Sequence, residues 1–236
     1  MAGLRTMSVR RNMNGRSDHL GLTTIPALYV VTDTVIGRGR SHAEIAASAA
    51  AGGAGIIQLR DKELAPEFLL GEAIAVREAL AGYGALFVVN DSLAVALASG
   101  ADGVHLGQSD GSVPEARAAA EAASLDSFII GVSVGSVDEA CRAVEEGADY
   151  VALSPVFATG SKADAGAGHG LRLLREIRSN VSVPIVGIGG IGPANVQDVF
   201  RAGADSAAVI SAVVGKDDVA AAARMMMGLI GQVKGQ

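Results

Sequence analysis

The sequence has 236 residues, half of them hydrophobic, only 3% aromatic and none of them tryptophan. The formal net charge of −6 and the few aromatic rings argue against a nucleic-acid surface, which needs cationic patches and stacking platforms. A single cysteine excludes a disulfide scaffold, and no apolar run is long enough to span a membrane. We therefore expect one cytoplasmic α/β domain, since this length suits a single α/β barrel.

Residues 1–24 differ in composition from the rest of the chain. They contain four arginines and one acidic residue, and they lack the apolar stretch of a secretory signal. An organelle presequence is one interpretation. We prefer a disordered extension or a start codon placed too early, followed by a catalytic domain over residues 25–236.

From residue 28 onward, short apolar segments of strand length alternate with helical patterns. Nearly continuous apolar strands are typical of a parallel sheet with both faces buried. The predicted strands are Leu28–Val31, Ile56–Leu59, Leu86–Val89, Gly103–Leu106, Ile129–Val132, Val151–Leu153, Ile185–Val186 and Ala207–Ile210. The predicted helices are His42–Ala51, Pro66–Ala81, Ser92–Ala98, Val113–Ala122, Val137–Glu145, Leu171–Arg178, Pro193–Ala202 and Val219–Val233. This alternation predicts a single (β/α)8 barrel, with Pro66, Pro114 and Pro193 in first helical turns.

A short internal repeat supports the barrel. The phrase Gly-Ala-Asp, or a variant of it, begins at Gly53, Gly100, Gly147 and Gly203. Glycine can end a helix in the left-handed conformation, and a short polar turn then leads into the next strand. The spacings of 47, 47 and 56 residues each hold two strand–helix units, a periodicity that an open sheet hardly explains.

Polar side chains collect at the carboxyl ends of the predicted strands, where the chemistry of such barrels takes place. They lie in Gln58–Lys62, Asn90 and Asp91, Gln108–Asp110, Ser133, Ser154–Lys162, Gly187–Ile191 and Ser211.

The charges in this set predict a site for an anion and a metal ion. Arg60 and Lys62 alternate along an extended segment, so both side chains can reach the same phosphate oxygens. Asp91 and Asp110 follow neighbouring strands, and a site with few carboxylates favours Mg²⁺ bound jointly with a substrate phosphate. Together they predict a pyrophosphate site. The alternative for Asp91 alone is a helix N-cap.

Gly187, Gly189 and Gly192 match the pattern G-x-G-x-x-G of dinucleotide-binding folds. That interpretation needs an acidic residue at the end of the following strand, whereas Asp205 precedes it. Backbone N–H groups after the last two strands of a barrel commonly bind phosphate, and Ser211 would add a hydroxyl group. We therefore prefer a monophosphate site.

The remaining candidates predict no chemistry. His105 lies within a predicted strand and is expected to pack inside the barrel, and His19, His42 and His169 have no partner pattern. Cys141 is interpreted as inert packing within a helix. The sequence shows no Ser-His or Cys-His arrangement.

Six stretches together resemble the thiamine-phosphate synthase family. They are Gln58–Lys62 (QLRDK), Asn90-Asp91, Gly103–Asp110 (GVHLGQSD), Gly131–Ser133 (GVS), Ser154–Lys162 (SPVFATGSK) and Val186–Ile191 (VGIGGI). They occur in order over most of the chain, and as a set they are very specific. The resemblance implies a (β/α)8 transferase that joins a hydroxymethylpyrimidine pyrophosphate to a carboxylated thiazole phosphate, releasing pyrophosphate and CO₂.

The same resemblance divides the site between two substrates and a metal ion. The residues implied for the pyrimidine pyrophosphate are Gln58, Leu59, Arg60, Asp61, Lys62, Asn90, Ser133 and Lys162. Those implied for the thiazole phosphate are Thr159, Gly160, Ser161, Gly190, Ile210 and Ser211. Asp91 and Asp110 would bind Mg²⁺. Arg60, Lys62 and Lys162, together with the ion, would stabilise the leaving pyrophosphate while a pyrimidine carbocation forms beside Ser133.

Two residues depart from the family pattern. Ser161 stands where the family often has threonine, and Ala158 where it often has proline.

Three other functions stay open. A thiazole tautomerase of the same superfamily would not need the metal carboxylates, and a sugar-phosphate epimerase would leave Arg60 and Lys62 without a role. A non-catalytic sensor of thiamin precursors would keep the same residues. We expect small-molecule partners only, and family analogy alone suggests a homo-oligomer.

Overall fold

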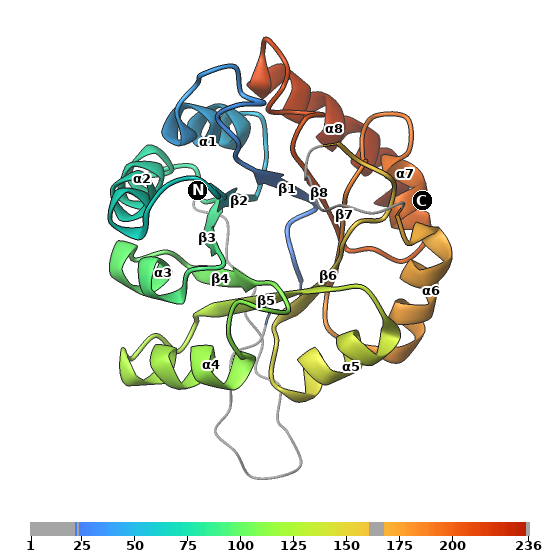
Figure 1. Cartoon of the computed structure of the whole chain (residues 1–236). Coiled ribbons are helices and arrows are strands. Elements are labelled where there is room, and N and C mark those ends of the chain that lie inside the picture. Colours follow the sequence, from blue (N-terminus) through green and yellow to red (C-terminus); the bar gives the residue numbers. More distant parts are fainter. Residues whose placement is uncertain (1–21, 23, 161–167, 235–236) are drawn as a thin grey trace.

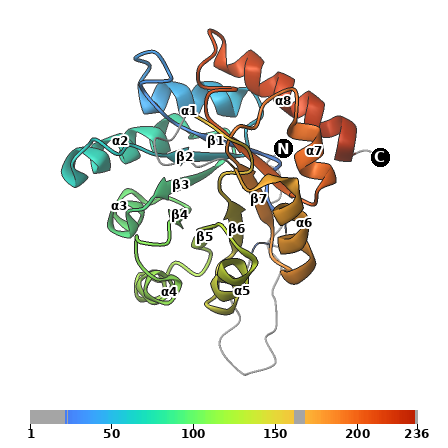
Figure 2. The ribbon, with the colours of Figure 1, turned by 45° about the vertical axis from the view of Figure 1, so that its right-hand side comes forward.

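The computed structural model describes residue 22, residues 24–160 and residues 168–234. Within this part of the chain, eight parallel strands pair in sequence order, and the last strand pairs with the first. Figure 1 shows the resulting closed barrel with the helices around its outside, and the rotated view in Figure 2 shows the same ring. The prediction of a single (β/α)8 barrel is confirmed. The predicted extension over residues 1–24 falls almost wholly outside the described residues.

Every predicted strand and helix is present. The strands are Leu28–Val31 (β1), Ile56–Leu59 (β2), Leu86–Asn90 (β3), Gly103–Leu106 (β4), Ile129–Val134 (β5), Tyr150–Leu153 (β6), Ile185–Ile188 (β7) and Ser206–Val209 (β8). The helices are His42–Ala51 (α1), Pro66–Ala79 (α2), Leu93–Ser99 (α3), Val113–Ala122 (α4), Val137–Glu145 (α5), Gly170–Asn180 (α6), Val196–Arg201 (α7) and Val219–Lys234 (α8). No helix among the described residues is both long and apolar enough to cross a bilayer.

Serine N-caps begin four of the helices. The side chains of Ser41, Ser92, Ser112 and Ser136 each accept a backbone N–H of the first turn of α1, α3, α4 and α5. In α1 and α4 a glutamate three residues later bonds back to the cap, so both orphan N–H groups are satisfied. These caps fix where each loop at the carboxyl face of the barrel turns into a helix.

Only the start of α7 differs from its prediction by more than two residues. Pro193 lies in a turn, in which the backbone N–H of Asn195 donates to the carbonyl of Gly192 at 3.2 Å. The side chain of Asn195 closes the same turn by accepting the N–H of Gly192 at 2.8 Å. Proline fits this turn because its fixed φ suits it and it has no N–H to satisfy. The predicted place of Pro193 in a first helical turn is therefore wrong.

The glycines of the repeat do what their positions predict. Gly53, Gly100, Gly147 and Gly203 have φ between 71° and 105°, in the left-handed region that follows a helix. They introduce β2, β4, β6 and β8.

The aspartates of the repeat link neighbouring strands by hydrogen bonds. Their carboxylates accept, at 2.8 Å, a backbone N–H near the start of the preceding strand, in the pairs Asp102–Phe87, Asp149–Ile130 and Asp205–Ile185. The first copy has Gly55 at this position, where a Cβ would lie 2.4 Å from Pro26 Cβ. Pro26 therefore excludes a side chain from the first copy.

Asp149→Ala should destabilise the barrel more than Asp205→Ala. Asp149 Oδ2 lies 2.7 Å from Arg117 Nη2, and both side chains are nearly buried, so its loss leaves a guanidinium without its counter-charge. We expect a loss of about 3 kcal/mol in the free energy of unfolding. The Asp205–Arg178 pair is half-exposed, and its loss should cost about 1 kcal/mol. Equal losses in urea unfolding would contradict this ranking.

Candidate active site

Two adjoining cavities lie at the carboxyl ends of the strands and share Ser154 and Pro155. The larger cavity, of about 300 Å³, is lined by side chains that include Arg60, Lys62, Asn90, Asp91, Asp110 and Ser133. The smaller cavity, of about 30 Å³, is lined by residues that include Thr159, Gly190, Ile210 and Ser211. Barrel closure therefore brings the predicted residues together in two groups.

Four predicted residues do not line either cavity. Leu59 is buried in the core, and Gln58 points into the barrel, where its side-chain N–H donates to the hydroxyl of Tyr29 at 2.7 Å. Asp61 points toward α1, and Gly160 lies outside both linings. Ser161 and Lys162 lie outside the described residues, so their predicted roles stay predictions.

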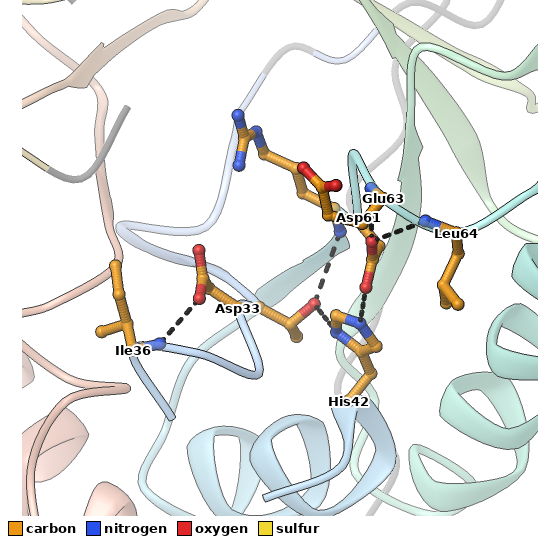
Figure 3. A network of polar contacts seen from close by, with 8 residues as sticks. Asp33, Ile36, His42, Asp61, Glu63 and Leu64 are labelled. Atoms are coloured by element: carbon orange, nitrogen blue, oxygen red, sulfur yellow. Dashed lines mark hydrogen bonds and ion pairs between the residues drawn. The ribbon is translucent and has the colours of Figure 1, made fainter. Parts of the chain in front are cut away.

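Asp61 lies between Arg60 and Lys62 in sequence, and its side chain belongs to a network of polar contacts with α1 and with the residues that follow it (Figure 3). Its Oδ1 accepts the backbone N–H groups of Glu63 at 2.8 Å and Leu64 at 3.0 Å, and its Oδ2 lies 3.2 Å from His42 Nε2. Burial alone would raise the pKa of Asp61, but these hydrogen bonds together hold it below its ordinary value. The carboxylate is therefore charged and holds its own loop in place.

His42 connects this loop to α1 and β1. The imidazole is buried, and its Nδ1 lies 2.7 Å from Thr32 Oγ1, which also accepts the backbone N–H of Arg60 at 3.4 Å. His42 thus has partners in the fold that no sequence pattern indicates. Its partners lie 10 and 19 residues away in sequence, in segments that meet only when β1 and β2 pair.

The two candidate metal ligands lie side by side. Lys62 Nζ donates to Asp91 Oδ2 at 2.5 Å, and the Asp110 carboxylate accepts the N–H of Gly107 at 2.9 Å. Burial, and then the neighbouring Asp110, raise the pKa of Asp91 above its ordinary value, although Lys62 lowers it. Asp91 also has a φ of 63°, an uncommon conformation for a residue other than glycine. The site thus holds two carboxylates whose repulsion a cation would relieve.

Asp91 is not a helix N-cap, because the adjacent Ser92 caps α3 by accepting the N–H of Val95 at 3.3 Å. No cluster of three or more acidic, histidine or cysteine side chains suited to a metal occurs among the described residues. Two carboxylates still fit Mg²⁺, which usually keeps several waters and takes its other ligands from a phosphate.

The glycines beside the smaller cavity let two loops approach closely. A Cβ on Gly189 would lie 2.4 Å from Pro155 Cβ, and one on Gly190 would lie 2.6 Å from the carbonyl oxygen of Ala158. Asp205 binds Ile185 and Arg178 ahead of β8. It therefore lies away from the carboxyl end of that strand, where a dinucleotide would need an acidic side chain.

Sequence reasoning assigned no role to two residues that line the larger cavity, Gln108 and Glu139. The side-chain N–H of Gln108 donates to the carbonyl of Ser133 at 2.6 Å, and Glu139 accepts the N–H of Gly135 at 2.7 Å. Gln108 was visible in the GQSD stretch, whereas nothing in the sequence marks Glu139 on α5.

His105 packs inside the barrel as predicted, but it also lines the larger cavity, where its Nε2 lies 2.9 Å from Ser133 Oγ. The expectation that the chain has no Ser-His arrangement is therefore wrong. β4 and β5 are neighbouring strands in which His105 pairs with Gly131, two residues before Ser133, and a linear sequence does not show this register.

Comparison with known proteins shows what the chain is similar to. A family model described as thiamine monophosphate synthase matches residues 28–213. A protein of Methanoculleus marisnigri named thiamine-phosphate synthase is 60% identical over 209 residues, which cover 89% of this chain and 97% of that one. One of Methanoregula boonei with the same name is 57% identical, with 89% and 95% covered.

Solved structures agree with these relatives. Thiamine phosphate pyrophosphorylase from Pyrococcus furiosus is 38% identical, superposes with a TM-score of 0.79, and matches over 88% of this chain and 96% of its own. A 3-hexulose-6-phosphate synthase, 23% identical with a TM-score of 0.66, covers 86% of this chain and 99% of its own and shares the fold alone.

His42→Ala should weaken the binding of inorganic pyrophosphate with Mg²⁺ by about tenfold, because side chains behind a binding residue orient it. The change removes the contact that holds Asp61 and Thr32 around the backbone of Arg60. Asp33→Ala is the matched control, since Asp33 lies in the same view but accepts the N–H of Ile36 (Figure 3). Calorimetric titration measures both, and an equal effect of the two changes would refute the positioning role.

Proposed function

The chain belongs to the thiamine monophosphate synthase family and acts as a transferase in thiamine biosynthesis, and from this premise we propose how its two cavities divide the reaction. The larger cavity binds 4-amino-2-methyl-5-hydroxymethylpyrimidine pyrophosphate, and the smaller one binds the (carboxy)thiazole phosphate. The observation that carries the proposal is that a cavity lined by Arg60, Lys62 and two carboxylates adjoins one lined by glycines and hydroxyl groups. Shared walls at Ser154 and Pro155 would bring the two reacting atoms together.

The pyrophosphate end of the first substrate is matched by charge. Arg60 presents a planar fork of donors and Lys62 a point charge, and both line the larger cavity. Asp91 and Asp110 would hold Mg²⁺, which when bound supplies positive charge beside the pyrophosphate oxygens. Lys62 offsets part of the negative charge of Asp91, which keeps the carboxylate pair in place.

Bond cleavage places the electron pair of the pyrimidine carbon–oxygen bond on the leaving pyrophosphate. Arg60 and Lys62 stabilise the charge that develops there, and Lys162 is assigned the same role by resemblance alone. The pyrimidine is left as a delocalised carbocation, which Asn90 and Ser133 hold in the cavity. The thiazole nitrogen then attacks it, and loss of CO₂ completes thiamine phosphate.

The thiazole phosphate has its own set of partners. Thr159, Ser211 and the backbone around Gly190 and Ile210 line the smaller cavity and suit a phosphate monoester. Ser161 joins this set by resemblance. A thiazole tautomerase would use this cavity alone and leave the carboxylate pair without a role.

Pyrophosphate release on mixing both substrates with Mg²⁺ tests the proposal. We expect release that requires all three components and falls about 100-fold or more in Asp91→Asn, since metal stabilisation of charge is worth several kcal/mol. Asp33→Ala is the control and should retain activity. No release, with the thiazole phosphate still bound, would favour the tautomerase or a precursor sensor.

As the pH falls, metal binding should be lost at a higher pH than it would be if Asp91 had the ordinary pKa of an aspartate. The pKa of Asp91 is raised by burial and by Asp110, so its carboxylate form is lost earlier as the pH falls. Lys62→Met removes the cation that lowers this pKa and should move the loss to still higher pH. Binding of Mn²⁺ alone, followed by electron paramagnetic resonance across pH, measures both; an unchanged profile in Lys62→Met would contradict the assignment.

A further inference from the structure

A continuous chain of hydrogen bonds crosses the barrel interior from Gln58 to Ser133. It runs through Tyr29, Tyr150 and His105, with successive distances of 2.7, 3.0, 3.0 and 2.9 Å. The five residues come from β2, β1, β6, β4 and β5, and the first four are at most 7% exposed. Only its last member, Ser133, and the adjacent His105 reach the larger cavity.

The barrel makes room for this chain. Gly131 pairs in register with Tyr150, and a Cβ on Gly131 would lie 2.0 Å from Tyr150 Cζ, so no larger residue fits there. The Tyr150 and His105 rings stack with centroids 5.6 Å apart, and the Tyr29 ring meets Tyr150 edge-on. Burial of polar groups is costly unless each is hydrogen-bonded, which the chain provides.

Donor and acceptor chemistry allows the chain to run in one direction, from Gln58 to Ser133. The side-chain nitrogen of Gln58 donates to the Tyr29 oxygen, and the Tyr29 hydroxyl can in turn donate its own hydrogen to the Tyr150 oxygen. Burial raises the pKa of both tyrosines, so both keep their phenolic hydrogens. The Tyr150 hydroxyl can then donate to His105 Nδ1, an arrangement that places the ring proton on Nε2, facing Ser133. In this arrangement the Ser133 oxygen accepts a hydrogen bond from the His105 N–H, and the hydroxyl hydrogen of Ser133 points elsewhere.

We propose that this chain makes Ser133 a fixed hydrogen-bond donor to an acceptor atom of the pyrimidine, with His105 and Tyr150 as positioning residues. The proposal rests on the proposed function, because it specifies how that cavity recognises its substrate. Ser133, His105 and Tyr150 resemble a nucleophile with its base and orienting group, but a protonated Nε2 cannot take the serine hydrogen. Ser133 therefore selects a ring nitrogen, which accepts, over the amino group, which donates.

Nitrogen-15 NMR of the histidine-labelled free protein tests the direction without any substrate. We expect the His105 ring proton on Nε2 in the wild type, and a mixture of both tautomers in Tyr150→Phe. Tyr83→Phe, the same change at an exposed tyrosine, is the matched control and should leave the spectrum unchanged. A wild-type proton on Nδ1 would overturn the proposal.

Substrate analogues test the recognition. Two pyridine analogues of the pyrimidine pyrophosphate each lack one ring nitrogen, and one of them should bind the wild type about tenfold more weakly, the usual effect of losing one hydrogen bond. Ser133→Ala should abolish this difference, His105→Leu should reduce it, and His105→Gln, which keeps a donor, should restore it. Equal binding of both analogues and the parent substrate by the wild type would overturn the proposal.

Binding titrations also distinguish a variant that fails to fold from one that has lost only the contact of Ser133 with the pyrimidine. Thiazole phosphate binding in the smaller cavity reports whether each variant is folded. If the wild type fails to bind the pyrimidine pyrophosphate, the proposed function fails, whereas the tautomer of His105 still decides the direction of the chain. Ser133→Ala should also keep measurable turnover, because loss of a nucleophile, unlike loss of a donor, would abolish it.

Discussion

Closure of eight parallel strands is the constraint on which the rest of this structure depends. It places every strand's carboxyl end on one face, so that residues from Arg60 to Ser211 line two adjoining cavities. It also removes both sheet edges and leaves an interior that side chains have to fill. Most of that filling is aliphatic. Four of the exceptions, Tyr29, Gln58, His105 and Tyr150, form one hydrogen-bonded chain that leads to the site.

Two buried histidines hold residues that lie at or next to the lining of the larger cavity. His42 holds the segment of Arg60 and Lys62 through Asp61 and Thr32, and His105 holds Ser133. Neither arrangement involves a flexible surface contact, because both imidazoles are almost fully buried. Binding groups held by packed and hydrogen-bonded neighbours need little reordering when a ligand arrives, which preserves binding energy for the reaction.

The carboxylate of Asp91, unlike the binding groups held by the two histidines, is destabilised by its surroundings in the free protein. Asp91 has an uncommon backbone conformation, is half-buried and lies beside a second carboxylate, so its charged form is disfavoured in the free protein. Such a cost persists where a ligand relieves it, and in the proposed function that ligand is a cation held with a substrate phosphate. Under that proposal, local destabilisation and affinity for a metal have the same physical source at this position.

Much of the architecture was predictable from sequence, because it rests on local patterns. Apolar strand-length runs and the glycine of the Gly-Ala-Asp repeat act within a few residues, and they were enough to predict the element order and the barrel. The strand-end residues Arg60, Lys62, Asp91 and Asp110 were predictable for the same reason, since position at a strand end already places them on one face. Tertiary structure alone decided that Gln58 and Asp61 face away from the cavity and that His42 and His105 support it. Those outcomes depend on inter-strand register and on which neighbour fills each space, and neither is encoded in local spacing.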